Sequence, residues 1–361
     1  MDNKKQIIHI VHRDRFATGY IEFMRMYFNE YVHRFVLLKG DTELDLESTE
    51  DIYYIEQYEE MLHDVSIFKA LQSADKIIVS GIWNMIETLY KCGSEILTKC
   101  YFHFWGGDFY RYRNIPYKWS QRHLHKDKYL LKKCLQKSAA VVNLIEEDYT
   151  ELKRILGIKD MKHFVAPMCK NPKENIDYAS YRNLEKTDNV CRILVGNSAT
   201  VHNQHEEILK ILSKYANENI EIYCPLSYGW KEYGDKVIAL GEEYFGDKFH
   251  PLTEQLPKEK YVEFLATCDI GIYNNNRQQA MGNISILARL GKKVYLRDDT
   301  AMWSHFEKIG YRFNKISELQ DADFEDITVY SEEQKNHNIQ ARELWEQQTI
   351  VLWKKVLCDN L

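Results

Sequence analysis

The sequence has few of the features that mark secreted, metal-bound or membrane-spanning proteins. Its 8 cysteines form no Cys-x-x-Cys pair and show no zinc spacing. Several stand in apolar runs, as buried thiols do, and such usage is typical of a reducing compartment. The chain enters a predicted strand within its first residues, so we expect no signal peptide, and no apolar run approaches the length of a membrane span. We therefore expect a cytoplasmic protein, or one peripheral on the cytoplasmic face of a membrane.

Glycine, proline and net positive charge are also scarce. The 361 residues include 16 glycines and 6 prolines, and no repeat or low-complexity tract appears. The formal net charge of −6 argues against free nucleic acid as a partner. With 45% hydrophobic and 28% charged residues, the composition is that of a globular chain long enough for two domains.

The first half of the chain alternates apolar strands with helical patterns. Strands are predicted at residues 6–11, 34–38, 76–80, 101–105 and 139–145, and helices at 17–31, 85–98 and 146–156. The acidic segment 41–64 is expected to be a solvated connection with some helix. Such alternation predicts a parallel sheet with helices on both faces.

A second alternating series follows a polar stretch. Strands are predicted at residues 192–195, 220–223, 236–240, 270–273 and 293–296, and helices at 206–215, 258–268, 281–291 and 331–357. We expect two Rossmann-like, doubly wound α/β domains that face each other across a cleft, as ligands bind at the carboxyl ends of such strands. The expected limits are 1–170 for the first domain, 171–188 for a linker, 189–330 for the second domain, and 331–361 for a C-terminal helix that packs back on the first.

The stretch 268–291 carries the main functional prediction. A buried strand leads into a polar loop and then into a helix that starts near Met281 or Gly282. The first amides of a helix are unpaired and its N-terminus is positive, so it attracts anions. Arg277, with Gln278 and Gln279 beside it, can grip a phosphate with a two-pronged guanidinium. We expect this loop to bind the diphosphate of a sugar nucleotide; an ordinary solvated loop is the alternative.

Two other strand exits have side chains that suit the same ligand. Gly196, Asn197 and Ser198 follow a strand and precede a helix, where a small loop lets the backbone approach a phosphate. Tyr223 ends the next predicted strand, and its exit, from Pro225 to Tyr228, suits a base or ribose. A plain tight turn and surface packing are the alternatives, but three such loops at parallel strand ends support one binding site better than any one of them.

Two carboxylates of the first domain follow predicted strands. Asp14 and Asp108 can each take a proton from a hydroxyl that attacks a sugar carbon; the alternative is a helix cap or a loop hydrogen bond. His12 is an alternative base, whereas His103 is expected to be packed in an apolar run. No metal site is predicted, and Asp321-Ala322-Asp323 is interpreted as solvated surface.

Residues 111–137 are strongly basic within an acidic protein. Four aromatic residues are interleaved: Tyr110, Tyr112, Tyr117 and Trp119. A single acid, Asp127, stands against nine basic residues: Arg111, Arg113, Lys118, Arg122, Lys126, Lys128, Lys132, Lys133 and Lys137. We expect this segment to contact anionic headgroups or a lipid diphosphate. The alternative is a basic, solvated helix face.

Four motifs, in this order along the chain, resemble a known family. They are His103-Phe104-Trp105-Gly106-Gly107-Asp108, Leu194-Val195-Gly196-Asn197-Ser198, Pro225-Leu226-Ser227-Tyr228 and Arg277-Gln278-Gln279-Ala280-Met281-Gly282. The family is that of the bacterial 4-acetamido-4,6-dideoxygalactose (Fuc4NAc) transferases of enterobacterial common antigen assembly. The resemblance implies a GT-B glycosyltransferase that uses a dTDP-sugar and a lipid-diphosphate acceptor at the inner face of the cytoplasmic membrane, without a metal.

Some positions match the family closely and others depart from it. Asp14 and Asp108 fall on acidic positions of the family pattern. The residues before Asp14 differ, Asn274-Asn275-Asn276 stands where the family is more apolar, and the acidic segment 41–64 is particular to this chain.

The sequence therefore predicts an inverting, metal-independent glycosyltransferase without a cofactor. The resemblance implies that it would move a Fuc4NAc-like sugar from a dTDP-sugar to a lipid-diphosphate-linked saccharide in surface polysaccharide assembly. Asp14 is the first choice for the base and Asp108 the second, and Arg277 would stabilise the leaving diphosphate. The donor-binding residues are expected to be Gly196, Asn197, Ser198, Tyr223, Pro225, Tyr228, Arg277, Gln278, Gln279, Gly282 and Asn283. The alternatives are a sugar-nucleotide epimerase and a non-catalytic carbohydrate-binding protein.

Overall fold

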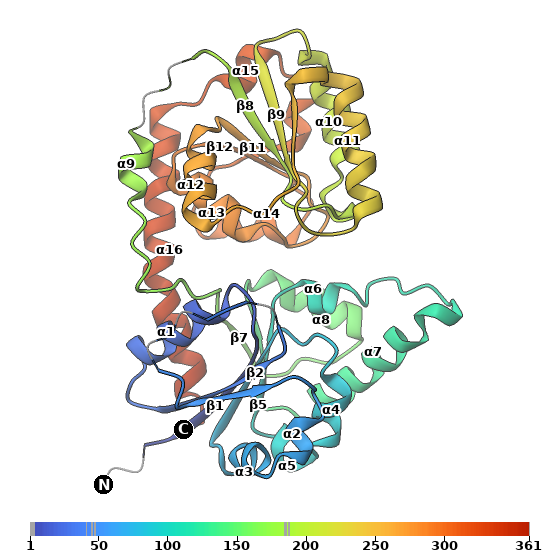
Figure 1. The fold of residues 1–361 in the computed structure, drawn as a ribbon, viewed down its shortest axis with the longest axis vertical. Helices are drawn as coiled ribbons and strands as arrows, with labels where there is room; N and C mark the ends of the chain where they lie inside the picture. Colours follow the sequence, from blue (N-terminus) through green and yellow to red (C-terminus); the bar gives the residue numbers. More distant parts are fainter. Residues whose placement is uncertain are drawn as a thin grey trace. The chain divides into compact units, whose positions relative to one another are not determined.

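A computed structural model describes residues 4–40, 42–44, 46, 48–183, 186 and 188–360. The chain forms two compact units (Figure 1). The first contains Met1–Asn175 together with Gln347–Leu361, and the second contains Ile176–Glu346. Each unit is a parallel sheet with helices on both faces, as the alternating pattern predicts.

The first unit is built on a seven-stranded sheet of order β3-β2-β1-β4-β5-β6-β7. The strands are β1 Gln6–His12, β2 Val32–Leu38, β3 Ile52–Ile55, β4 Lys76–Ser80, β5 Cys100–Phe104, β6 Ala140–Asn143 and β7 His163–Val165. The helices are α1 Ala17–Tyr27, α2 Glu60–His63, α3 Val65–Ser73, α4 Ile86–Lys91, α5 Ser94–Leu97, α6 Gly107–Tyr110, α7 Arg122–Leu135 and α8 Glu147–Leu156. Alternate residues of β1 enter different cores: Ile8 and Ile10 pack beneath α3, α4 and α7, and Ile7 and Val11 beneath α1.

The second unit is built on a six-stranded sheet of order β10-β9-β8-β11-β12-β13. The strands are β8 Cys191–Val195, β9 Ile220–Pro225, β10 Phe249–Leu252, β11 Ile270–Tyr273, β12 Lys293–Leu296 and β13 Asn314–Lys315. The helices are α9 Tyr178–Arg182, α10 His205–Leu212, α11 Lys231–Phe245, α12 Lys258–Thr267, α13 Met281–Arg289, α14 Ala301–Lys308, α15 Phe324–Thr328 and α16 Glu332–Cys358. Helices α10 and α11 cover one face, and α12, α13 and α14 cover the other.

The long helix α16 contributes to both units. Ala341 packs in a core of the second unit, whereas Trp353, Val356 and Leu357 pack in a core of the first. The buried Lys76 of β4 donates from its ammonium to the carbonyls of Val356, Leu357 and Asp359, at the C-terminus of α16. A cation at that position complements the negative end of the helix dipole. Its desolvation lowers the pKa of Lys76 to about 8.

Some elements differ from those predicted. The predicted strand 236–240 is wrong: it lies inside α11, and the strand that follows is β10. Its apolar run of four residues had suggested a strand, but α11 uses Gly241 to pack on Phe249 of β10, where an added Cβ would lie 2.3 Å from the ring. The predicted helix 85–98 is divided into α4 and α5 at Gly93, whose φ is +88°.

Short elements were missed. Strand β3 lies inside the acidic segment 41–64, β7 follows α8, and α9 lies inside the predicted linker 171–188. The side chain of Asp177 caps α9 by accepting from the amides of Ala179 and Ser180, and α9 belongs to the second unit. Parts of the two predicted segments, namely Asp41, Asp45, Glu47, Leu184, Glu185 and Thr187, lie outside the described residues.

A chain of buried polar side chains crosses the first unit beneath α1. His33 Nε2–H donates to the Phe28 carbonyl at 2.9 Å, His9 Nε2–H donates to His33 Nδ1 at 2.8 Å, and Tyr20 donates to His9 Nδ1 at 2.8 Å. Each ring therefore has one defined neutral tautomer, because a proton on either acceptor nitrogen would face another donor. Burial lowers the pKa of His9 well below 6.5 and also lowers that of His33.

We expect this series of hydrogen-bonded side chains to make the stability of the first unit sensitive to acid. Because the pKa of each histidine is lower in the folded than in the unfolded protein, stability is complete above about pH 6.5 and declines as the pH falls below it. Each histidine contributes a loss of at most about 2 kcal/mol at pH 5. Thermal unfolding measured from pH 8 to pH 5 tests this, with His33→Gln as the comparison: that variant keeps hydrogen-bonding groups, removes one titration and should show a shallower decline. An equal slope in both proteins would contradict the assignment.

Candidate functional site

The carboxyl ends of β8, β9, β11 and β12 lie along one edge of the sheet in the second unit. The loops that follow these four strands are residues 196–204, 226–230, 274–280 and 297–300. In open α/β sheets this is the edge at which ligands bind. The three loops that the sequence analysis selected are therefore brought to the same side of one sheet.

The first loop turns at Gly196, whose φ is +70°. An added Cβ would lie 2.5 Å from Nε2 of His205 and 2.9 Å from Oδ1 of Asn203, and both of these side chains are buried. Glycine is thus required here for its backbone conformation and for the close approach of two polar side chains.

Asn203 joins the first loop to the loop after β11. Its Oδ1 accepts from the amide of Asn197 at 3.0 Å and from Nδ2 of Asn275 at 3.1 Å. Its Nδ2 donates to the carbonyl of Ser198 at 3.0 Å and to Oγ1 of Thr200 at 3.0 Å. The sequence analysis missed this residue, because an asparagine in a short turn carries no periodic signal; only its position soon after Gly-Asn-Ser pointed to the site.

Gln279 also connects the same two loops. Its Nε2 donates to Oδ1 of Asn197 at 3.1 Å and to Oγ of Ser198 at 2.9 Å. Asn197 in turn donates from Nδ2 to the hydroxyl of Tyr228 at 2.7 Å, in the loop after β9. The structure therefore brings together residues from all three selected loops in one hydrogen-bonded network.

The start of α13 lies directly after this network. Among the described residues, no side chain caps its N-terminus and none accepts from the amides of Met281, Gly282 and Asn283. Gly282 is exposed, with open space where a Cβ would stand. Arg277 is half-buried in the preceding loop, and its Nη1 donates to the carbonyl of the buried Gln278. Unpaired amides, a helix dipole and a guanidinium within a few residues favour an anion.

Three predicted binding residues do not join this network. The hydroxyl of Tyr223 donates to Oε2 of Glu221 at 2.8 Å, toward the amino end of β9. Pro225 is buried as the last residue of β9, so placing it in the exit loop was wrong. Asn283 donates from Nδ2 to the hydroxyl of Tyr261 on α12, at 2.9 Å.

Arg297, which the sequence analysis also missed, follows β12 at the same edge. Its Nη1 donates to Oε1 of Gln204 at 2.6 Å, and its other nitrogens bond to the carboxylate of Asp299. Asn274 donates to Oε2 of Glu207 on α10 at 2.8 Å. The polar edge therefore extends from the loop after β9 to the loop after β12.

In the first unit, Asp14 follows β1 at the carboxyl edge of its sheet. It is half-buried, and its Oδ1 accepts from the amide of Phe16 at 2.8 Å. Burial raises the pKa of Asp14, and the Phe16 amide and the neighbouring Arg15 charge oppose that effect. A partly accessible carboxylate with a raised pKa suits proton acceptance.

Asp108 has a different environment. It is fully buried and accepts from the amide of Trp105 at 3.1 Å and from that of Ile82 at 3.2 Å. Burial raises the pKa of Asp108 to about 6. Its side chain joins the exit loops of β4 and β5, which is the loop hydrogen bond given as its alternative role. The geometry favours Asp14 over Asp108 as a group that meets a substrate.

The two histidines near these carboxylates also differ. His12 Nε2–H donates to the carbonyl of Gly81 at 3.0 Å, and burial lowers its pKa. His103 is buried and bonds to the hydroxyl of Ser80 and the carbonyl of Ala166, which confirms that it is packed.

Metal-binding and membrane-spanning features were searched over the described part of the chain. No group of three or more His, Cys, Asp or Glu side chains is placed to hold a metal ion there. Of the Asp-x-Asp pair, both carboxylates are exposed and Asp323 caps α15, which confirms the interpretation as surface. No described helix combines the length and apolar character that crossing a bilayer requires.

Solved structures share the whole fold. A glycosyltransferase from Rickettsia africae matches with a TM-score of 0.67 at 16% identity, over 99% of this chain and 100% of that one. The Anabaena protein HepE, solved with UDP and glucose, matches with a TM-score of 0.65 at 9% identity, over 98% of each chain. The lipopolysaccharide outer core galactosyltransferase WaaB matches with a TM-score of 0.64 at 9% identity, over 99% of this chain and 100% of that one.

Two Rossmann-like units of this kind define the GT-B class of glycosyltransferases, and the fold of this protein is GT-B. The family model described as 4-alpha-L-fucosyltransferase, glycosyl transferase group 56, matches residues 22–328, and the chain belongs to that family. The protein is therefore a glycosyltransferase rather than an epimerase or a non-catalytic carbohydrate-binding protein.

We expect Asn203→Ala to weaken nucleotide-sugar binding by roughly tenfold or more, because it leaves buried groups of two loops without partners. The same change should lower the unfolding temperature. Titration calorimetry with the donor nucleotide measures the first effect and thermal unfolding the second. Asn217→Ala, on an exposed turn of the same unit, is the matched control. Unchanged affinity in Asn203→Ala would show that the network does not position the loops for a ligand.

Proposed function

We propose that the second unit binds the diphosphate of a nucleotide-sugar at the loops after β8 and β11, and that the enzyme transfers the sugar with inversion and without a metal. The observation that carries the proposal is the Gln279 network with Asn197 and Ser198, next to Arg277 and the uncapped start of α13. The network fixes the loop, and Arg277 and the first amides of α13 are the donors for an anion that becomes more negative as the sugar leaves.

The proposed reaction needs two charge changes to be stabilised. The acceptor hydroxyl oxygen bonds to the anomeric carbon while the bond from that carbon to the diphosphate oxygen breaks, and the electron pair leaves with the diphosphate. Arg277 and the first amides of α13 stabilise the leaving group. Asp14 takes the proton of the hydroxyl, and its raised pKa supports that role.

For the substrates, we propose a dTDP-linked Fuc4NAc-like sugar as donor and a lipid-diphosphate-linked saccharide as acceptor, used at the cytoplasmic face of the cell membrane in surface polysaccharide assembly. Support for a deoxyhexose comes from the description of the family as 4-alpha-L-fucosyltransferases. Support for a nucleotide-sugar comes from the complex of HepE with UDP and glucose, and support for a surface saccharide from WaaB.

Arg277→Ala should lower turnover by about a hundredfold or more, because it removes a donor to the leaving diphosphate, while the protein stays folded. Release of free nucleoside diphosphate measures turnover, in parallel with and without EDTA to test metal independence. Arg312→Ala is the matched control, since that arginine is exposed in the same unit. Near-normal turnover of Arg277→Ala would contradict the proposed role.

The same two variants serve a thermal-shift screen of dTDP-, UDP- and GDP-sugars against the wild-type protein. A ligand that binds the folded protein raises its unfolding temperature. We expect stabilisation by dTDP-sugars, a reduced shift in Arg277→Ala and a normal shift in Arg312→Ala. Stabilisation by GDP-sugars alone would overturn the proposed donor.

Asp14→Asn should lower turnover by about a hundredfold or more, because the amide cannot accept the proton. In the wild type, turnover should fall as the pH drops through the raised pKa of Asp14, and this acid limb should be absent in the variant. Asp108→Asn is the comparison: we expect it mainly to lower stability and to keep the acid limb. The pH profiles of turnover for all three proteins decide between the carboxylates, and loss of the limb in Asp108→Asn alone would reverse the assignment.

A further inference from the structure

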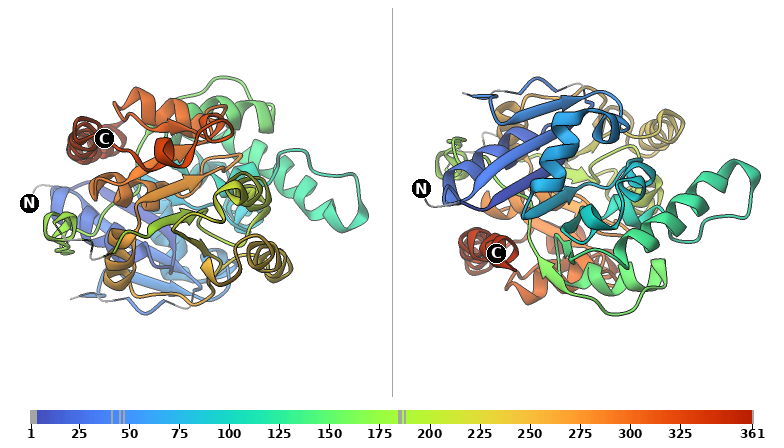
Figure 2. Two further views of the ribbon diagram at one scale, coloured as in Figure 1. Left: turned by 90° about the horizontal axis from the view of Figure 1, so that it is seen from above. Right: turned by 90° about the horizontal axis from the view of Figure 1, so that it is seen from below.

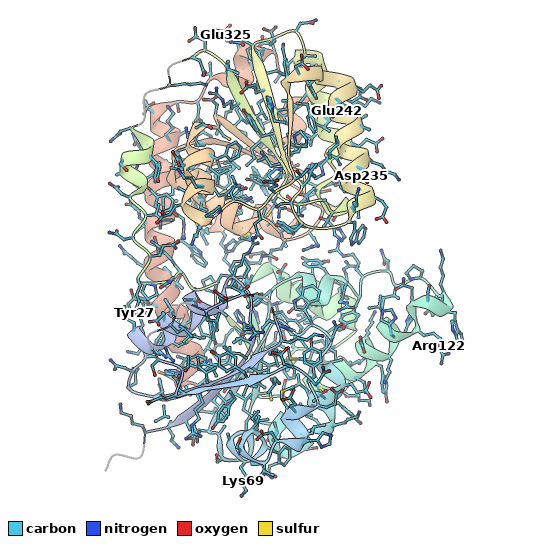
Figure 3. The ribbon with its side chains drawn as sticks, in the orientation of Figure 1. Tyr27, Lys69, Arg122, Asp235, Glu242 and Glu325 are labelled. Atoms are coloured by element: carbon cyan, nitrogen blue, oxygen red, sulfur yellow. The ribbon has the colours of Figure 1, made fainter. Side chains whose placement is uncertain are left out.

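Helix α7 and the segment before it extend away from the rest of the first unit (Figures 1 and 2). Arg122, at the start of α7, lies at the outer end of this extension (Figure 3). The C-terminal half of α7 is anchored, since Leu130, Leu131 and Cys134 are buried in a core of the unit. We call residues 114–128 the basic aromatic tip.

The tip exposes large aromatic side chains to an unusual degree. Tyr117 is 99% exposed and Trp119 is 81% exposed. Side chains of this size normally bury most of their surface, because removing apolar area from water is favourable. Adjacent exposed aromatic residues on a projecting loop therefore indicate a surface that is covered in use.

Basic and imidazole side chains of the tip contact both of these rings. The guanidinium of Arg122 lies 3.8 Å from the ring centroid of Trp119, and the ring of His125 stacks on Tyr117 at 5.0 Å. No carboxylate within the described chain forms an ion pair with Lys118, Arg122 or Lys128. By contrast, Lys126 pairs with Glu87 and Arg113, just before the tip, pairs with Glu151.

Exposed aromatic rings next to basic side chains suit the headgroup region of an anionic lipid bilayer. Tyrosine and tryptophan rings partition to the headgroup level, and each basic residue near an anionic surface adds attraction. The chain as a whole carries a formal net charge of −6, so the attraction must come from a local concentration of basic residues. Single-stranded nucleic acid also binds to basic residues and stacking rings, but the formal net charge of −6 opposes it.

We propose that the basic aromatic tip docks on an anionic membrane surface, with Tyr117 and Trp119 at headgroup level and Lys118, Arg122 and Lys128 against lipid phosphates. This inference rests on the proposed function, because docking on a membrane would bring the enzyme to its proposed lipid-linked acceptor. It assigns the contact to residues that take no part in donor binding or in proton transfer.

The test is flotation of the full-length protein with empty vesicles, made either of phosphatidylcholine alone or of phosphatidylcholine with phosphatidylglycerol. We expect binding to the anionic vesicles only, and weakening by added salt. Lys118→Gln/Arg122→Gln should lower binding by on the order of tenfold or more, given roughly fivefold for each basic residue. Tyr117→Ser/Trp119→Ser should lower it comparably. Brominated lipid should quench wild-type tryptophan fluorescence more than that of Trp119→Phe.

The matched controls are Lys69→Gln/Lys236→Gln, which removes the same charge from exposed positions elsewhere, and Tyr54→Ser, which removes an aromatic side chain that is 45% exposed. Both should bind like the wild type. Equal binding to neutral vesicles, equal loss in the controls, or binding to an oligonucleotide with unchanged flotation in the tip variants would each overturn the proposal.

The donor thermal-shift screen separates this proposal from the proposed function. Tip variants that respond normally to the nucleotide but fail to float support the docking surface. Variants of the donor site that float normally but lose the nucleotide response show that docking is independent of donor binding.

Discussion

The polar edge of the second unit depends on one constraint: the buried polar groups of its first loop and of the loop after β11 must hydrogen-bond to each other. Asn203 accomplishes this from a buried position, with both its carbonyl and its amide in use. It can do so only because Gly196 has no Cβ, which would otherwise occupy the space of the Asn203 and His205 side chains. Burial lowers the pKa of His205 to about 4, so this crowded position holds a neutral ring. The positive charge next to this network is supplied by Arg277 and by the start of α13.

Preformed loops matter for the chemistry of a glycosyltransferase. A leaving diphosphate gains negative charge during the reaction, and donors that are already oriented stabilise it without reorganising. Gln279 spends its amide on Asn197 and Ser198, and this holds the loop that carries Arg277 against the first loop. The first unit uses the equivalent edge differently: there Asp108 joins two exit loops as a buried carboxylate, and Asp14 keeps partial exposure. Two acidic residues with similar sequence positions, each just after a strand, therefore have different environments.

Sequence patterns predicted the parts of the fold that have a marked local signal. Strands β1 and β4 were confirmed because each is a mostly apolar run, as expected of a strand that is buried on both faces. Helices α8 and α16 were confirmed because each is a helical stretch without internal Gly or Pro. Strands β3 and β7 were missed because they are only four and three residues long, too short for a pattern to stand out, although their residues favour strands. The same limit applies at the site. Parallel strand ends share an edge, so the three loops could be selected in advance; the direction of Tyr223 and the central role of Asn203 depend on side-chain packing, which no local pattern encodes.

The two proposals place anion binding at two separate groups of positive charge in this acidic chain. At physiological ionic strength the Debye length is about 8 Å, so a local group of cations acts almost independently of the net charge. Arg277 is half-buried, so salt screens its charge little. Lys118, Arg122 and Lys128 of the basic aromatic tip are more accessible, so salt screens their charges more strongly. A soluble anionic donor and an anionic surface would therefore be held by interactions with different salt dependence. Because these interactions involve different elements, one can change in evolution, or in an engineered variant, without a change in the other.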